Sequence, residues 1–489
     1  MRRAEDARMI IDFDRGTLLL SRPREAVTAA PLALAPGVLW DGRTGNFRAP
    51  GRFHRAICSH LASANVDWAY GEGWPGSTSR EPIALHGGER EPLTLRDHQR
   101  AALAAWLSEQ WGVVALPTGS GKTRVALAAI AAVAVTTLVL VPTRVLLHQW
   151  VAELERWFRG PIGRIGDGVC QLAGITVATF SSFVRSLGGA GRGGAAIADQ
   201  LAAGYDLLVI DEAHHAVETA LRDALDLSTA RRRLGLTATP PTDPAALADL
   251  AERVGPSVFT LAPAELAGDA LAPFEVIVVP VALSADAAVG YGRDLATIDA
   301  AWRAFRVDRP TELGRTGSAW RDFVKTCHRT PWGRDVVQAI RRNELRLAYP
   351  ESKQAALSAL LKRHAADRCL VFAPDNGTVY RIARDHLCAP ITCDIGAEER
   401  QAVLRSFEVG ELRHLVSGRV LNEGMDVPAA GIAVIVGGRG GAREHVQRVG
   451  RVLRPAPGKR AIVYELVVQG TQEEVRSARR NRSLFGARS

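Results

Sequence analysis

The stretch Leu116-Pro117-Thr118-Gly119-Ser120-Gly121-Lys122-Thr123 decides the fold of this chain. An apolar run that ends at Leu116 predicts a buried strand, and an alanine-rich run that begins at Lys122 predicts a helix. Between them, glycine and hydroxyl residues let backbone N–H groups turn toward an anion at the positive end of that helix. The stretch therefore predicts a phosphate-binding loop, with Leu116 at the position where a glycine normally stands.

The lysine of this loop stands out against the composition. The chain holds 61 lysines and arginines, and only five of them are lysines, at positions 122, 325, 353, 362 and 459. A lysine inside a Gly-Lys-Thr tripeptide is therefore not explained by background usage. A glycine turn before a helix is the alternative interpretation of the stretch taken alone.

The whole chain has the length and charge of a multidomain protein with a polyanionic partner. Its 489 residues suffice for about three domains, each with its own core. The formal net charge of +9 favours nucleic acid, although an arginine-rich, lysine-poor composition also follows from genomic base composition alone. The six cysteines form no C-x-x-C pair, so we expect reduced thiols, a cytoplasmic location and no zinc or iron–sulfur site.

Neither secretion nor a membrane span is expected. The N-terminus lacks the apolar core of a signal peptide. Residues 125–141 are uncharged, but they divide at Thr136-Thr137 into the helix after the phosphate loop and a following strand.

The first 62 residues predict a small α+β domain. Residues 9–20 read as a hairpin that turns at Gly16, and a basic helix is expected around residues 52–61. Aromatic and arginine residues alternate in residues 40–50, a pattern that suits base stacking and phosphate contact but equally suits a small domain that packs its own aromatics. Residues 63–92 are rich in Gly, Pro, Ser and Glu and predict a linker.

Residues 93–245 alternate strand and helix, as in an open parallel sheet covered by helices. Gln99 precedes a helix and can both donate to and accept from an adenine edge. An apolar strand delivers Asp211 and Glu212 at its carboxyl end, where such sheets place ligands. One acid can hold Mg²⁺ together with Thr123, and the other can orient or deprotonate water.

Residues 246–350 predict a basic helical insertion. Positions 300–350 hold ten arginines and one lysine against five acids, with tryptophan and phenylalanine among them. Such a segment can grip a nucleic-acid strand. A solvated helical connector is an equally good interpretation.

Residues 351–470 alternate strand and helix again, which predicts a second sheet domain before a basic tail at residues 471–489. Arg448, Arg451 and Arg454 lie three apart, on one face of a helix. Arginines packed on one face repel unless an anion lies opposite, and the γ-phosphate held by the first domain is such an anion.

Together, Lys122, the run Asp211-Glu212-Ala213-His214 and the run Gln447-x-x-Gly450-Arg451-x-x-Arg454 resemble the DEAH-box helicases of superfamily 2, over about residues 93–470. Within that superfamily the chain is most similar to the XPB-type DNA repair helicases, including the bacterial ones. Residues 95–99, residues 421–428 and the run 40–50, which is similar to their damage-recognition region, carry this closer likeness.

The resemblance implies an α/β fold with two RecA-like parallel-sheet domains, ATP and Mg²⁺ between them, and 3′–5′ movement on single-stranded or forked DNA. It implies ATP contacts from Gln99, Pro117, Thr118, Gly119, Ser120, Gly121, Lys122, Thr123, Gly424 and Asp426, with Mg²⁺ on Thr123 and Asp211. It implies catalytic roles for Lys122, Asp211, Glu212, Gln447, Arg451 and Arg454. It implies nucleic-acid contacts from Thr143, Arg144, Thr179, Phe180, Asp375 and Arg419, and coupling through His214, Thr237 and Thr239.

Two departures from the family pattern bear on function. An Arg-Glu-Asp triplet is expected shortly after the Thr-Ala-Thr motif, but residues 241–244 read Pro-Thr-Asp-Pro, which argues against strong unwinding. Gly418 stands beside Arg419 where a threonine is common. A duplex translocase of a defence or restriction system, an RNA helicase and a nucleic-acid clamp without ATPase activity are therefore alternatives, and a nuclease or repair protein is a candidate partner.

The arginine pattern generates the first prediction. Arg454→Ala should leave ATP binding largely intact and lower DNA-stimulated hydrolysis by on the order of a thousandfold, because a finger of this kind contacts the transferring phosphoryl group. Steady-state phosphate release with and without DNA measures the effect. Unchanged hydrolysis would count against a cleft shared by two domains.

Overall fold

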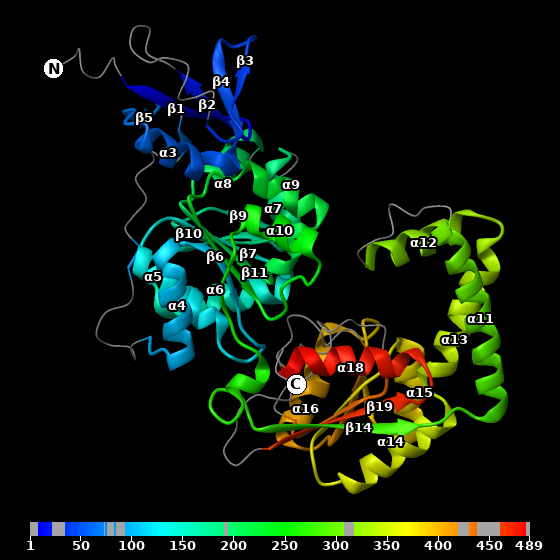
Figure 1. Ribbon diagram of the computed structural model, residues 1–489. Helices are drawn as coiled ribbons and strands as arrows, with labels where there is room; N and C mark the ends of the chain where they lie inside the picture. Colours follow the sequence, from blue (N-terminus) through cyan, green and yellow to red (C-terminus); the bar gives the residue numbers. More distant parts are fainter. Residues whose placement is uncertain are drawn as a thin grey trace. The chain divides into compact units, whose positions relative to one another are not determined.

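The computed structural model describes residues 8–21, 35–72, 74–75, 83–84, 93–189, 194–307, 317–418, 430–437 and 460–485. These residues form two compact units. The first runs to Thr260, apart from Pro117–Ser120, and the second begins at Leu261. Both combine helices with a largely parallel sheet (Figure 1), so the predicted α/β fold class is confirmed. No described helix is long and apolar enough to cross a membrane.

The first unit begins with a small five-stranded sheet in the order β3-β4-β2-β1-β5. Its strands are β1 (Met9–Asp14), β2 (Thr17–Ser21), β3 (Leu39–Asp41), β4 (Asn46–Pro50) and β5 (Trp68–Tyr70). The hairpin β1–β2 turns at Gly16, where φ is +84°, and the helix α3 (His54–Ser63) packs Ile57 and Leu61 into the same core. β5 pairs with β1 and so extends the sheet into the predicted linker. The sequence did not predict this strand, because three residues are too few to show a period.

This small sheet is built onto the rest of the first unit. Ala202 and Ala203 belong to the same buried cluster as the strands β1 and β2. Arg52 Nη1 lies 2.7 Å from a Glu252 oxygen. His54 Nδ1 donates to the Thr229 carbonyl at 2.7 Å. Burial lowers the pKa of His54 to about 4, so this ring is neutral and forms part of a fixed contact.

The main sheet of the first unit has eight strands in the order β13-β6-β12-β11-β7-β10-β8-β9. Its strands are β6 (Trp111–Ala115), β7 (Thr137–Val141), β8 (Ile162–Gly166), β9 (Val169–Gln171), β10 (Ile175–Thr179), β11 (Leu207–Asp211), β12 (Arg232–Thr237) and β13 (Ser257–Thr260). All neighbours are parallel except β8 and β9. The uncharged residues 125–141 do divide into a helix and the strand β7, as predicted.

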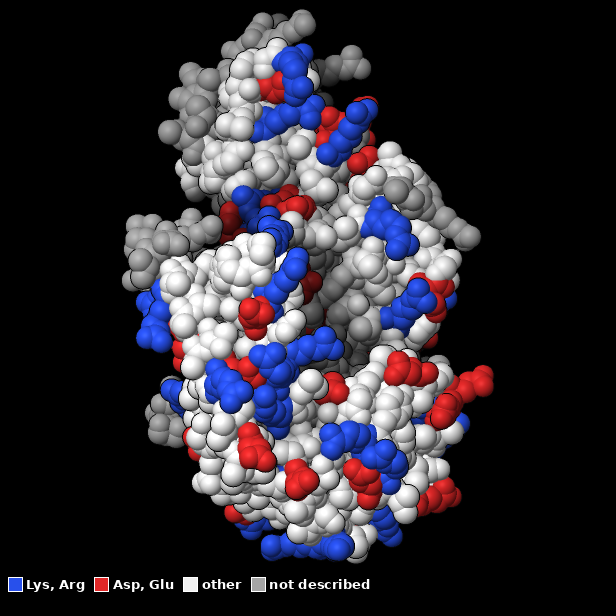
Figure 2. Space-filling view, turned by 90° about the vertical axis from the view of Figure 1, so that its right-hand side faces the viewer, with Lys and Arg blue, Asp and Glu red and all other residues white. Residues whose placement is uncertain are grey.

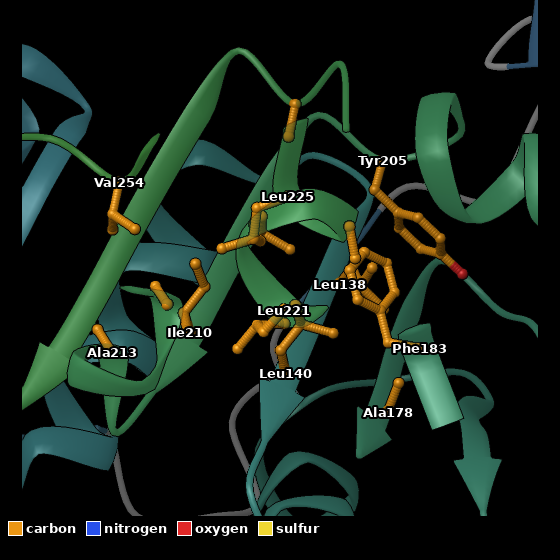
Figure 3. Close-up of a cluster of buried hydrophobic side chains, with 14 of the residues drawn as sticks. Leu138, Leu140, Ala178, Phe183, Tyr205, Ile210, Ala213, Leu221, Leu225 and Val254 are labelled. Atoms are coloured by element: carbon orange, nitrogen blue, oxygen red, sulfur yellow. The ribbon is translucent and has the colours of Figure 1, made fainter. Parts of the chain in front are cut away.

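Helices cover both faces of this sheet, which explains why β7, β10 and β11 are buried along their whole length. The helices are α4 (Asp97–Glu109), α5 (Lys122–Val133), α6 (Arg144–Trp157), α7 (Phe180–Leu187), α8 (Gly194–Ala203), α9 (Thr219–Leu227) and α10 (Pro244–Arg253). On one face, Leu140, Phe183 and Leu225 meet in a continuous apolar cluster (Figure 3). This core fixes the carboxyl ends of the strands.

The second unit is built on a parallel sheet in the order β14-β19-β18-β15-β17-β16. Its strands are β14 (Phe274–Val281), β15 (Cys369–Phe372), β16 (Ala389–Ile391), β17 (His414–Ser417), β18 (Ile432–Ile435) and β19 (Ala461–Val468), and its helices are α14 (Glu351–Arg363), α15 (Asn376–His386), α16 (Ala397–Val409) and α18 (Gln472–Phe485). The predicted insertion begins later than residue 246: residues 246–253 complete α10, residues 257–260 supply β13 to the first sheet, and residues 274–281 supply β14 to the second. The basic composition that suggested an insertion belongs only to the residues after them.

The inserted helices are α11 (Ala285–Val307), α12 (Gly317–Arg329) and α13 (Gly333–Ala348). Phe305 and Phe323 are buried in a small core with Trp302 beside them. These aromatics therefore stabilise the insertion itself. Trp320 and Trp332 are 39% and 50% exposed and leave an aromatic surface for other contacts.

A buried ion pair ties the end of the insertion to the second sheet domain. Lys353, in α14, is fully buried and donates to a Glu473 carboxylate oxygen at 2.9 Å and to the Leu347 carbonyl at 2.8 Å. The other oxygen of Glu473 accepts the Val468 N–H at 3.0 Å. Burial lowers the pKa of Lys353 and the carboxylate of Glu473 opposes that shift.

Lys353→Met should lower the free energy of unfolding of the second unit by about 3–5 kcal/mol, because Glu473 is left buried without its cation. The double variant Lys353→Met/Glu473→Gln removes both charges and keeps an acceptor for the Val468 N–H, so it should recover at least half of the loss. Urea unfolding of the full chain measures both. A double variant as unstable as the single one would show that the charge pairing is not what stabilises this junction.

Candidate nucleotide and nucleic-acid sites

The predicted phosphate loop connects β6 to α5. Gly119 and Gly121 have φ of +86° and +84°, values that favour glycine. Leu116 is buried, which suits an apolar side chain, and its N–H donates to the Thr237 carbonyl at 2.9 Å. Lys122 is the first residue of α5, and its Nζ donates to the Leu116 carbonyl at 3.2 Å.

Gln99 lies beside this loop. The glutamine is buried in the first turn of α4, and its Oε1 accepts the Arg96 N–H at 2.9 Å. A Cβ added at Gly121 would lie only 2.3 Å from Gln99 Nε2, so the amide packs against the backbone of the loop. The two ends of the Gln99 amide, Oε1 and Nε2, are thus both in contact with backbone.

The paired acids lie at the carboxyl end of β11. Asp211 is buried; its Oδ1 accepts the Glu212 N–H at 3.0 Å and its Oδ2 accepts the Trp150 Nε1–H at 2.9 Å. Burial raises the pKa of Asp211, and the Trp150 hydrogen bond and the Lys122 charge oppose that shift. Glu212 has φ of +50°, a strained conformation of the kind found at functional sites.

Hydrogen bonds join these acids to the neighbouring strand. His214 is buried, with its Nδ1 3.1 Å from Thr237 Oγ1 and 3.4 Å from Glu212 Oε2. The Thr237 hydroxyl also accepts the Thr239 N–H at 3.1 Å. The three predicted coupling residues therefore form one contiguous group.

Two further strands carry the nucleic-acid residues predicted in the first unit. Thr143 follows β7 and caps α6 by accepting the Leu146 N–H, while Thr179 ends β10 and caps α7 by accepting the Ser182 N–H. Arg144 is 75% exposed and lies 3.5 Å from Asp167. Phe180 begins α7, with its ring centroid 5.8 Å from that of His215. Two capped helix starts with an exposed arginine can bind phosphate groups.

In the second unit the structure describes only one of the predicted functional residues. Asp375 caps α15 and accepts both the N–H and the hydroxyl of Thr378, at 2.8 and 2.9 Å, which gives it a structural role of its own. The remaining predicted residues lie outside the described residues: Arg419, Gly424, Asp426, Gln447, Arg451 and Arg454.

The exposed charges form no single basic surface on the face drawn in Figure 2, where basic side chains are interspersed with acidic ones.

A glycine loop with its lysine, followed two strands away by paired acids, defines the chain as a P-loop nucleotide hydrolase. Three family models match: "Type III restriction enzyme, res subunit" at residues 92–242, "Helicase conserved C-terminal domain" at 352–456, and "Xeroderma pigmentosum group B helicase damage recognition domain" at 11–69.

Relatives extend these matches over most of the chain. The "DNA 3'-5' translocase XPB2" of Sulfurisphaera tokodaii is 32% identical over 392 residues, 80% of this chain and 85% of the relative. The "DNA 3'-5' helicase XPB" of Mycobacterium tuberculosis is 28% identical, with 84% of this chain and 68% of the relative covered. A solved Pyrococcus furiosus Hef helicase domain aligns at 18% identity and a TM-score of 0.47, covering 78% of this chain and 97% of that one. The chain belongs to the XPB-type family of superfamily 2 helicases.

One residue at this site was missed from the sequence. Trp150 follows the pattern of Leu147, Leu154 and Trp157, the buried stripe of an amphipathic helix, so a core role accounts for it completely. Only the tertiary structure brings its indole N–H to Asp211.

Thr237→Val keeps the shape of the threonine but removes the hydroxyl that His214 and the Thr239 N–H contact. DNA-stimulated ATP hydrolysis should fall about tenfold, equivalent to about 1.4 kcal/mol, the order of one or two lost buried hydrogen bonds. Thr237→Ser keeps the hydroxyl and is the matched control. Equal rates for the valine and serine variants would remove Thr237 from the coupling group.

Proposed function

We propose that this chain is an ATP-driven DNA translocase or helicase that moves 3′–5′ and acts in DNA repair. One observation carries the proposal. Five neighbouring strands of a single sheet carry the predicted site residues. The predicted nucleotide-binding residues lie at the ends of β6, β12 and β11, and the predicted DNA-binding residues lie at the ends of the next two strands, β7 and β10. The XPB relatives are named as DNA 3'-5' translocase and DNA 3'-5' helicase, which supports the same activity and direction.

The first unit fits a triphosphate with Mg²⁺. Lys122 and the backbone N–H groups of residues 118–123 bind the phosphates, at the start of α5. Thr123 and Asp211 offer the hard oxygen atoms that Mg²⁺ prefers. When bound, Mg²⁺ supplies charge that offsets the negative charge of the phosphates. Glu212 orients the attacking water and accepts its proton.

The coupling group passes the state of the nucleotide to the DNA residues. Glu212, His214 and Thr237 are in contact, so a change at the γ-phosphate alters the hydrogen bonds that reach Thr239. Arg451 and Arg454 of the second unit complete the site as arginine fingers, with Gln447, Gly424 and Asp426 beside the nucleotide. Gln99 reads the adenine.

The finer assignments belong to the same proposal. They are the DEAH-box subgroup, from the run Asp211 to His214, and the domain limits at residues 92, 350 and 470. They also include DNA contacts at Asp375 and Arg419, a nuclease or repair protein as partner, and a cytoplasmic location. The scattered cysteines support the last of these.

A duplex translocase of a restriction-type system is the second candidate. Two observations favour it: residues 92–242 match a restriction-enzyme subunit, and the segment 241–244 serves to start α10. Asp243 caps that helix by accepting the Ala246 N–H at 3.1 Å, and Pro244 occupies its first turn. The Arg-Glu-Asp triplet is thus replaced by a helix start.

The deciding experiment measures ATPase rate with single-stranded DNA, duplex DNA and RNA side by side, with strand-displacement and triplex-displacement assays on the same substrates. We expect DNA to stimulate hydrolysis well above RNA, and Lys122→Ala to abolish it. Stimulation by duplex with triplex displacement but no strand displacement would favour the second candidate. RNA-specific stimulation would indicate an RNA helicase, and no stimulation by any of the three would indicate a clamp.

A further inference from the structure

Trp150 connects two parts of the first unit that the sequence keeps apart. It lies in α6, it is 2% exposed, and its indole Nε1–H donates to Asp211 Oδ2 at 2.9 Å. The same helix begins at Arg144, directly after the cap residue Thr143. One rigid element therefore touches the predicted metal-binding acid at one point and the predicted DNA contacts at its start.

The hydrogen bond restricts how the Asp211 carboxylate can turn. The terminal torsion of an aspartate is broad and roughly two-fold, so the plane of a carboxylate is set by its partners. Here the Glu212 N–H holds one oxygen and Trp150 holds the other. Loss of the indole donor leaves a single backbone contact to orient the group.

The helix between the two ends is one continuous, packed element. Leu147, Trp150, Leu154 and Trp157 form a buried stripe that anchors α6 against the sheet. Thr143 and Trp150 are seven residues apart, about 10 Å along the axis at 1.5 Å per residue. A displacement of the helix start is thus carried to the indole with little room for side-chain adjustment.

We propose that Trp150 is a positioning residue that couples the DNA-binding start of α6 to the orientation of Asp211. This inference rests on the proposed function, since it assumes that Thr143 and Arg144 contact DNA and that Asp211 holds the nucleotide's metal. It predicts that DNA and nucleotide influence each other's binding partly through this one hydrogen bond.

The chain offers a matched control for a merely structural role. Trp106, in α4, is also fully buried, and its Nε1–H also donates at 2.9 Å, but its acceptor is the backbone carbonyl of Arg233. Trp106→Phe and Trp150→Phe each remove one buried indole donor while keeping an aromatic ring. A difference in coupling between the two variants therefore arises from the lost hydrogen bond to Asp211 and not from the loss of packing.

The experiment measures binding and not turnover. The affinity of the full chain for a fluorescent single strand is determined by anisotropy, without nucleotide and with Mg²⁺ and a non-hydrolysable ATP analogue. The ratio of the two dissociation constants is the coupling, for which a factor of about 5 to 150 is typical. We expect the wild type and Trp106→Phe to share one ratio, and the ratio of Trp150→Phe to be smaller by about threefold or more, since the contacts of His214 and Thr237 remain.

Trp150→His separates positioning from packing. Its imidazole retains a ring N–H near the position of the indole N–H, but it lacks the six-membered ring and fills the site less well. If Trp150 positions Asp211, the histidine variant keeps more coupling than the phenylalanine variant although it is less stable to heat. If Trp150 only fills space, the histidine variant is the more impaired of the two, and the inference is overturned.

The two proposals fail in different ways. A wild type whose ATPase rate does not respond to DNA contradicts the proposed function, and the inference with it. A DNA-stimulated wild type whose coupling ratio survives in Trp150→Phe contradicts the inference alone.

Discussion

The parallel register of β6, β12 and β11 is the constraint on which the nucleotide site depends. Ala115 pairs with Thr237, and Leu236 pairs with Asp211, so the predicted phosphate loop, Thr237 and the proposed metal-binding acid Asp211 emerge at one edge of the sheet. The Leu116 N–H extends this ladder by one bond to the Thr237 carbonyl. A slip of one residue would turn each side chain to the opposite face. The buried apolar residues of these strands fix the register, and so they also hold the site residues at their positions.

Two strands that carry predicted nucleic-acid contacts end in the same way, with a threonine that caps the following helix. β7 and β10 each end in a threonine that caps the next helix, Thr143 for α6 and Thr179 for α7. A hydroxyl cap satisfies one of the first N–H groups and leaves others directed outward, beside the positive end of the helix. The phosphate contacts that we propose on both halves of the edge thus lie at strand-to-helix turns, with Lys122 as the cation of one half and Arg144 as that of the other.

Much of this was predictable because short-range signals encode it. The strand before Lys122 and the strand before Asp211 are apolar runs, and their motifs follow directly. The rest depends on contacts between distant residues. β5 has three residues and exists through its pairing with β1, β14 pairs with β19 from the far end of the chain, and the Trp150 indole meets Asp211 across 61 positions. None of these three long-range contacts can be predicted from the periodicity of apolar residues in the sequence. The predicted arginine fingers lie outside the described residues, so their placement is still a prediction.

The partners of the carboxylates distinguish structural acids from the acid that we assign to catalysis. Asp294 is held by Arg342 and Arg346, the Arg342 hydrogen bond first among the causes that lower its pKa to about 2, and Glu473 is paired with Lys353. These acids have their charge neutralised by a cation of the chain. Asp211 accepts instead from two neutral N–H groups; burial raises its pKa, and the Trp150 hydrogen bond and the charge of Lys122 only oppose that shift. A buried carboxylate oriented by neutral donors keeps a negative potential that only a cation relieves. The same two hydrogen bonds that fix the geometry of Asp211 therefore also suit the metal-binding role that we propose for it, and an arginine in the place of Trp150 would oppose that role.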